Sequence, residues 1–303
     1  MKSSRSKKKW QPTLFQTEKL EVAEPADVPK IERPYSLPGI LLGTSSFTAK
    51  GWAGPFYSPS MKSRDYLSYY STQFATVEID STFYGCPSPN TVSSWSARTP
   101  EDFTFAVKVP QIITHEKALV DCDSEFEEFV RTMDILGPKL GPMVFQFPKF
   151  DHRKFPKLGD FLAVLVPFLK KLPADHKFVV EVRNKTWLDA RFVGVLQENN
   201  VALALTDTSF MPRPWELKEP PDLITADFAY VRWLGDRKGI EELTKTWDKT
   251  IVDRTKDMKN WVELARTLIR ERKLRHLFLF ANNHYAGHAP DTVRLFEKLW
   301  ANE

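Results

Sequence analysis

The sequence predicts an α/β fold, a single TIM-like (β/α)8 barrel preceded by a flexible tail. Eight short apolar segments with strand-like composition recur after residue 38, and apolar residues at helical spacing fill most of the connections between them. The polar residues of these segments gather at their C-terminal ends, where barrel enzymes build their sites. A chain of 303 residues is long enough to bury the core of such a barrel.

Residues 1–38 differ in composition from the rest of the chain. Five basic residues crowd the first ten positions, and a polar, acidic, proline-bearing stretch follows. This segment has too few spaced apolar residues to pack a core. We therefore expect a disordered basic tail over residues 1–38 and a barrel domain over residues 39–303.

The expected strands are bounded by turn residues and rich in β-branched and aromatic side chains. In chain order they are Ile40–Ser45, Thr76–Phe83, Phe103–Val109, Met143–Phe147, Phe178–Asn184, Val201–Asp207, Phe228–Leu234 and His276–Asn282. Helical spacing predicts helices between them at Tyr66–Phe74, Phe126–Leu136, Phe161–Lys171, Trp187–Glu198, Trp261–Arg272 and Val293–Trp300. Two connections lack a simple helical period: residues 208–223 are proline-rich and predict a surface loop, and residues 235–275 form a long excursion.

The polar residues near the C-terminal ends of the predicted strands occupy alternate positions, so in each strand their side chains share one face. Successive strand side chains point to opposite faces, so one parity of each strand faces the barrel interior. We expect the following residues to meet at the mouth of the barrel: Glu78, Asp80, Lys108, Gln146, Glu181, Arg183, Asp207, Arg232 and Asn283. His115 and His284 follow the third and eighth strands and are expected at the rim. The alternative for each residue alone is a structural ion pair.

Mixed charges in one mouth predict acid–base chemistry on an anionic substrate. Glu181, Asp207 and Glu78 are the candidate catalytic carboxylates, because neighbouring charges and burial can shift carboxyl pKa values in opposite directions. Three cations, Lys108, Arg183 and Arg232, are expected to bind a phosphate or carboxylate. The other candidate substrate-binding residues are Asn283, Gln146, His115 and Asp80.

No cofactor is predicted from the sequence. Glycine-rich dinucleotide or phosphate-loop spacing is not found, and Cys86 and Cys122 have neither metal-ligand nor disulfide-framework spacing. A weak Mg²⁺ or Mn²⁺ site formed by Glu78, Glu181, Asp207 and a histidine is the alternative chemistry. Zinc prefers nitrogen and sulfur ligands and fits this set poorly.

Several segments resemble the YecE-like family, a family of TIM-like barrels catalogued as domain of unknown function 72. The matching segments are VEIDSTFYG, TPEDFTFAVKVPQIITH, LGPMVFQFP, VVEVRNKTW, FAYVRWLG and FANNHYAGHAP. Two positions depart from the family pattern, which usually has Asn where this chain has Asp80 and often has His where it has Leu234. The resemblance implies a TIM-like barrel and little about chemistry. The similarity of such barrels to xylose-isomerase-like barrels, which include apurinic endonucleases, suggests by analogy a role in binding nucleic acid or phosphate.

The tail carries a second resemblance. Gln11-Pro12-Thr13-Leu14-Phe15 is similar to the Gln-x-x-Leu-Phe peptides with which bacterial DNA-processing proteins bind the replication sliding clamp. Gln11, Leu14 and Phe15 would be the anchors, and the alternative is a chance match in a solvated leader.

Two functions therefore remain open. The first is an enzyme acting at the barrel mouth on a phosphate-bearing substrate, a nucleic acid or a nucleotide, with a hydrolase or phosphodiesterase-like reaction. The second is a non-catalytic DNA- or sliding-clamp-associated binding module. No apolar run of about 18 residues predicts a membrane span, and the basic N-terminus lacks the apolar segment of a signal peptide, so we expect a cytoplasmic protein.

Overall fold

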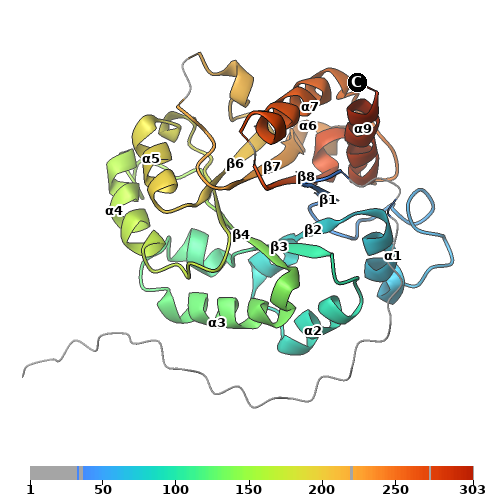
Figure 1. The fold of residues 1–303 in the computed structure, drawn as a ribbon, viewed down its shortest axis with the longest axis horizontal. Helices are drawn as coiled ribbons and strands as arrows, with labels where there is room; N and C mark the ends of the chain where they lie inside the picture. The colour runs from blue at the N-terminus through green and yellow to red at the C-terminus, as the bar shows by residue number, and fades with distance from the viewer. Residues whose placement is uncertain (1–32, 34–36, 219–220, 273, 303) are drawn as a thin grey trace, which may run out of the picture. The chain divides into compact units, whose positions relative to one another are not determined.

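A computed structural model describes residue 33 and residues 37–218, 221–272 and 274–302. Eight parallel strands pair in the order β1-β8-β7-β6-β5-β4-β3-β2 and form a nearly closed barrel, with helices in the connections (Figure 1). The prediction of a TIM-like barrel is confirmed. The predicted tail up to residue 32, with its candidate clamp motif, lies outside the described residues.

The strands are short and lie close to their predicted positions. They are β1 (Ile40–Thr44), β2 (Thr76–Ile79), β3 (Thr104–Lys108), β4 (Leu140–Gln146), β5 (Phe178–Glu181), β6 (Ala202–Thr208), β7 (Phe228–Gly235) and β8 (His276–Ala281). The helices are α1 (Tyr66–Gln73), α2 (Pro89–Ala97), α3 (Asp123–Met133), α4 (Leu158–Leu169), α5 (Ala190–Glu198), α6 (Arg237–Leu243), α7 (Thr255–Arg270), α8 (Asn283–Ala286) and α9 (Ala289–Ala301). Among these, α2, α6 and α8 were not predicted. The start of α2 is nevertheless encoded locally, because Ser88 accepts a hydrogen bond from the Thr91 amide and Pro89 occupies the first helical turn.

A tyrosine side chain joins the first and second strands, between which the backbone ladder is interrupted. The Thr44 amide donates to the Tyr70 hydroxyl at 2.8 Å, and this hydroxyl lies 3.2 Å from the Thr76 carbonyl oxygen, to which it can donate. Gly43 permits the close approach, since a Cβ atom there would lie 2.1 Å from the same carbonyl oxygen. The seam between β1 and β2 is therefore closed through α1, which carries Tyr70.

The barrel interior is packed with large side chains from one side and small ones from the other. Strands β7 and β8 contribute four aromatic rings to the interior cluster, and strands β3 to β6 contribute small residues. Its members are Ala106, Val144, Val179, Ala202, Ala204, Phe228, Tyr230, Phe278 and Phe280. The opposite parity, which includes Leu203, Leu205 and Leu279, belongs to the larger cluster packed beneath the helices. This division identifies which side chains face the interior.

Two predicted strands end three or more residues earlier than expected. Strand β2 stops at Ile79, and Asp80–Tyr84 form a 3-10 turn instead of extending the strand to Phe83. The Thr82 hydroxyl lies 2.9 Å from the Ile79 carbonyl oxygen and 2.7 Å from the Lys108 carbonyl oxygen, so a local side-chain bond competes with continued strand pairing. Strand β5 likewise stops at Glu181. In the part of the chain that the structure describes, no helix is long and apolar enough to cross a membrane.

Candidate functional site

Arg232, near the C-terminal end of β7, lies at the centre of a buried charge cluster. Its Nη2 donates to Glu78 at 2.7 Å and to Asp80 at 3.2 Å, its Nε donates to Glu78 at 3.2 Å, and its Nη1 donates to Glu181 at 2.5 Å. The side chains of Arg232, Glu78 and Glu181 are almost fully buried. A single guanidinium group therefore bridges carboxylates from β2, β5 and the turn after β2.

Tyr230 completes the environment of the deepest carboxylate. It precedes Arg232 by two residues on β7, so both side chains face the interior, and its hydroxyl donates to Glu78 Oε2 at 2.6 Å. The pKa of Tyr230 is raised well above its usual value, first by burial and then by the charge of Glu78. The hydroxyl thus remains a hydrogen-bond donor to Glu78, which receives bonds from both β7 side chains.

Glu181 stays ionised in spite of its burial. Burial acts to raise its pKa, but the charges of Arg232 and Arg183 outweigh that effect and hold the pKa below its ordinary value. Arg183 Nε lies 3.3 Å from Glu181 Oε1. Glu181 therefore connects the buried arginine with one at the rim.

Asp80 is the carboxylate of this cluster with access to solvent. Its side chain is 30% exposed, against 0% for Glu78 and 2% for Glu181. Burial and the negative charge of Glu78 raise the pKa of Asp80 to about 6, although Arg232 and Lys108 oppose the rise. Asp80 is therefore the acidic side chain of the mouth that exchanges its proton near neutral pH.

Two cations at the rim have weaker partners than Arg232. Lys108 Nζ lies 3.8 Å from Asp80 Oδ1, beyond hydrogen-bond distance, and 4.1 Å from the centre of the Phe83 ring. Arg183 uses its Nε on Glu181, its side chain is 34% exposed, and its guanidinium lies over the Phe210 ring at 5.7 Å. Both side chains retain donors for a ligand.

His115 and Gln146 are also in the mouth. Burial, together with the charges of Lys108 and Arg183, lowers the pKa of His115 to about 4, so its ring is neutral at physiological pH. The His115 Nδ1 lies 2.9 Å from the Thr114 hydroxyl, and its ring meets the Phe83 ring edge-to-face. Gln146 is in register with Glu181 and donates to the Phe147 carbonyl at 2.6 Å.

Asp207 does not reach this cluster, so its predicted position in the mouth is wrong. It accepts hydrogen bonds from Arg213 at 2.8 Å, from Trp261 of α7 at 2.8 Å and from Tyr285 of α8 at 3.0 Å. The inward residue of β6 is Thr206, which is in register with Arg232. Asp207 therefore points outward and ties the loop after β6 to the surrounding helices.

Asn283 is misplaced by the same error of parity. Its Oδ1 accepts from Trp52 Nε1 at 3.1 Å and from the Ala289 amide at 3.0 Å, so it links the loop after β1 to the start of α9, outside the barrel. Phe280 is in register with Arg232 and faces inward, which puts Leu279 and Ala281 on the outer face. The rim candidate His284 contacts Asn282 and Glu241, away from the Arg232 cluster.

Sequence reasoning missed two polar groups near the mouth. Tyr230 lies in the middle of an apolar strand, and only its place two residues before Arg232 points to a role. Ser45 directly follows β1, and its Oγ is buried without a hydrogen-bond partner among the described residues. Its position at the end of a predicted strand was an available signal.

The predicted metal ligands are not brought together. Glu78 and Glu181 share the Arg232 guanidinium, which stands where a divalent cation would have to bind both, and Asp207 faces outward. Within the described ranges, no group of three or more His, Cys, Asp and Glu side chains could hold a metal ion. The set Glu78, Glu181, Asp207 and a histidine therefore does not fit Mg²⁺ or Mn²⁺.

Sequence comparison places the chain among proteins of unknown function. The family profile described as "Protein of unknown function DUF72" matches residues 41–303. The chain is 36% identical over 119 residues to the UPF0759 protein YecE of Escherichia coli K12, covering 39% of this chain and 41% of that protein. It is 32% identical over 151 residues to the UPF0759 protein YunF of Bacillus subtilis, covering 47% and 51% of the two chains. The matched parts thus span about two-fifths to half of these relatives.

Solved structures agree with the fold. A DUF72 family protein from Thermotoga maritima is 25% identical, with a TM-score of 0.68 over 87% of this chain and 99% of that one. A DUF72 family protein from Enterococcus faecalis is 20% identical, with a TM-score of 0.61 over 88% and 99%, a likeness of fold alone. Because the profile covers nearly the whole barrel domain, this chain belongs to the DUF72 family.

Proposed function

We propose that this protein is an enzyme that binds a phosphate-bearing substrate, a nucleotide or nucleic acid, at the C-terminal mouth of the barrel. The observation that carries the proposal is Asp80, a partly exposed carboxyl group whose pKa is raised to about 6 between cations. A proton donor or acceptor works best when its pKa lies near the operating pH. The neighbouring Glu78 and Glu181 accept short hydrogen bonds from Arg232 and serve to hold it.

The rim cations support binding of an anion. The formal charges of three carboxylates offset those of Arg232, Lys108 and Arg183, but Arg232 takes two of the carboxylates in short bonds. Lys108 and Arg183 are left with longer contacts, and their side chains are 11% and 34% exposed. We therefore assign anion binding to Lys108 and Arg183, and a structural role to Arg232.

Aromatic side chains beside these cations support a base-bearing ligand. Tyr84 is 78% exposed and packs edge-to-face on Phe83, which also contacts Lys108. Phe210 is 46% exposed and lies against Arg183. Exposed rings next to cations can stack on a base while the cations bind its phosphate.

The charge of the substrate decides which way Asp80 transfers its proton. An anionic group near Asp80 raises the pKa of that carboxyl further, because it disfavours a second negative charge. Asp80 is then protonated in the complex and acts as a general acid toward an oxygen of the substrate. We expect kcat/KM to fall as the pH rises above about 6, the pKa of the free carboxyl.

Binding can be tested by isothermal titration calorimetry, with adenosine monophosphate as the probe. We expect Arg183→Gln to weaken binding by about tenfold or more, since a charge-assisted hydrogen bond contributes roughly 1.5–3 kcal/mol. Arg131→Gln, which changes an exposed arginine of α3, is the matched control and should bind as the wild type does. Equal affinity of all three proteins would remove Arg183 from the proposed site.

Catalysis can be tested with para-nitrophenyl phosphate and its bis-ester as substrates. Asp80→Asn should abolish turnover while keeping adenosine monophosphate binding, because asparagine retains the acceptor oxygen for Arg232 but cannot donate an acidic proton. Any residual turnover by Asp80→Asn should lack the fall in kcat/KM above about pH 6. Turnover by Asp80→Asn at the wild-type rate, or no turnover by the wild type of either ester or of a single-stranded oligonucleotide, would contradict the enzymatic proposal.

A further inference from the structure

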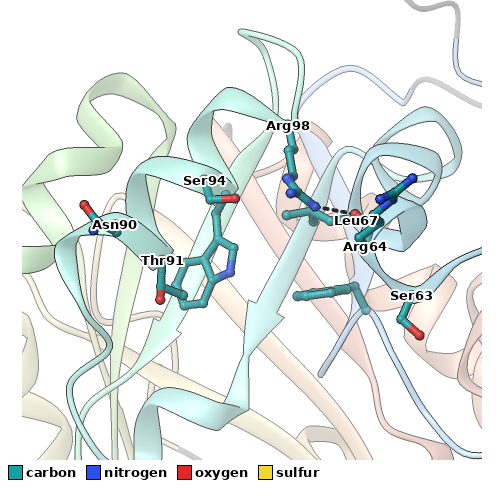
Figure 2. A pocket seen from close by; sticks show the side chains of 9 residues that line it. Ser63, Arg64, Leu67, Asn90, Thr91, Ser94 and Arg98 are labelled. Carbon is teal, nitrogen blue, oxygen red and sulfur yellow. Dashed lines mark hydrogen bonds between the residues drawn. The ribbon is translucent and has the colours of Figure 1, made fainter.

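A cavity of about 390 Å³ lies between α1 and α2, lined by residues other than those of the Arg232 cluster (Figure 2). The turn before α1 contributes Arg64, α2 contributes Trp95, the turn directly after α2 contributes Arg98, and the loop after β1 contributes Phe47. A volume of this size falls within the roughly 300–1,000 Å³ of small-molecule sites. The cavity can therefore hold a ligand with one or two rings.

The two arginines of this cavity lack strong counter-charges. Arg98 directly follows α2, and its guanidinium donates to the backbone carbonyl of Arg64 (Figure 2). In the described part of the chain, no carboxylate lies within 4.0 Å of Arg98. Among the residues that the structure describes, Arg64 has a single contact of this kind, Asp65 at 3.8 Å, and its side chain is 69% exposed. The remaining donors of the two guanidinium groups are available to an anion.

The walls of the cavity are apolar and aromatic. Phe47 and Trp95 are half-buried, and Leu67 of α1 is buried beneath them. The Trp95 ring lies at 22° to the Phe105 ring, with the two centroids 6.3 Å apart, so core packing supports one side of the indole. Ser94 and Asn90 add polar groups along α2. A planar ring can pack on these walls while its charged group meets the arginines.

We propose that this cavity is a second ligand site, which binds a small anion carrying a planar aromatic ring. The charged group, a phosphate, phosphonate or carboxylate, contacts Arg98 and Arg64, and the ring packs against Trp95 and Phe47. The site does not depend on the function proposed for the mouth, because none of its lining residues belongs to the Arg232 cluster.

Phenylphosphonate is a suitable probe, since it combines one ring with one anionic group. The indole N–H signals of the tryptophans are followed by heteronuclear NMR during titration of the full chain, and Trp95→Phe identifies the signal of Trp95. We expect a saturable shift of this signal at millimolar probe. Methylphosphonate, which lacks the ring, and phenol, which lacks the charge, should each shift it much less.

Two substitutions test the role of the arginines. Arg98→Gln and Arg64→Gln should each raise the Kd for phenylphosphonate by about tenfold, the loss expected for one charge-assisted hydrogen bond. Arg64→Gln keeps the test valid if Arg98→Gln fails to fold, because the Arg64 side chain is largely exposed. Arg131→Gln and Arg183→Gln should leave the Trp95 shift unchanged, which separates this site from the mouth.

Any one of three outcomes would overturn the proposal. The first is a Trp95 signal that does not shift in a saturable way, and the second is a shift with phenol as strong as that with phenylphosphonate. The third is wild-type affinity for phenylphosphonate in both arginine variants. An unchanged Trp95 signal together with adenosine monophosphate binding at the mouth would reject this site and leave the function proposed for the mouth intact.

Discussion

Replacing Arg232 by methionine tests the charge cluster most directly. The substitution keeps most of the side-chain volume but removes four hydrogen bonds to three carboxylates. Removing one partner of a buried ion pair typically costs about 3–5 kcal/mol, because the other partner is left charged and buried. We expect Arg232→Met to lower the free energy of unfolding by about this amount at neutral pH, a large fraction of the roughly 5–15 kcal/mol of a typical domain.

The pH dependence of this loss has a definite sign. In the wild type the pKa of Glu181 is lowered, so Glu181 contributes stability that is present above its unfolded pKa and lost as the pH falls through its folded pKa. In Arg232→Met, burial without this cation raises the pKa of Glu181, and its ionisation then reduces stability as the pH rises. The difference between the two proteins should therefore be small near about pH 4 and grow toward about pH 7.

Urea denaturation followed by tryptophan fluorescence and circular dichroism gives both free energies. The matched control is Lys171→Met, which breaks the exposed pair of Lys171 and Asp123 and should change stability little at any pH. A loss below about 1 kcal/mol at neutral pH, or the same loss at acid and neutral pH, would refute the buried-charge reasoning.

Three other perturbations follow from the same structure. Tyr70→Phe should lower the free energy of unfolding by about 1–3 kcal/mol in urea denaturation, because it leaves the buried amide and carbonyl at the β1–β2 seam without their bridge; an unchanged midpoint would mean that water replaces the hydroxyl. Tyr230→Phe should lower the free energy of unfolding by about 1.5–3 kcal/mol, because it removes a charge-assisted hydrogen bond to a buried carboxylate. An unchanged free energy of unfolding would show that this hydrogen bond does not contribute to stability. We also propose that a peptide of residues 8–18 binds the sliding clamp of its source organism weakly, in a calorimetric or polarisation assay, and that joint Leu14→Ala and Phe15→Ala substitution abolishes the binding. Equal binding of both peptides would make the motif a coincidence.

Strand positions were predictable because their apolar runs are bounded by turn residues. Which side chains of a strand face the barrel interior was predictable only where the polar group lies on one face alone. In β3, Lys108 alternates with Phe105 and Val107, so its inward orientation could be read correctly. In β6, Thr206, Asp207 and Thr208 are consecutive polar residues, and the residues before them are apolar on both faces. Because Asp207 is charged, it was predicted to face inward. The smaller Thr206 before it is the residue that faces the crowded interior.

The shape of the turn after β2 depends on contacts that a sequence pattern does not contain. Alternation predicted that Glu78 and Asp80 share one face of a strand that continues to Phe83. Thr82 instead bonds the Ile79 carbonyl and reaches across to Lys108, which folds the chain into a 3-10 turn. Asp80 consequently stands closer to solvent than Glu78, and this difference in burial, not the residue type, gives the two carboxylates different roles.

Stability measurements on Asp80→Asn can distinguish a proton-transferring residue from a structural ion-pair partner. Because the folded pKa of about 6 exceeds the ordinary value of 3.8, ionised Asp80 lowers the free energy of unfolding, and this loss develops as the pH rises from the lower value through the higher one. Asparagine cannot ionise, and it keeps the oxygen that accepts from Arg232 at 3.2 Å. We expect Asp80→Asn to be at least as stable as the wild type at about pH 8 and to lose this advantage near pH 4, as measured by urea denaturation. A variant that is less stable than the wild type at the higher pH alone would show that the pKa of Asp80 is lowered in the folded protein, and that Asp80 serves mainly as a counter-charge to Arg232 and Lys108.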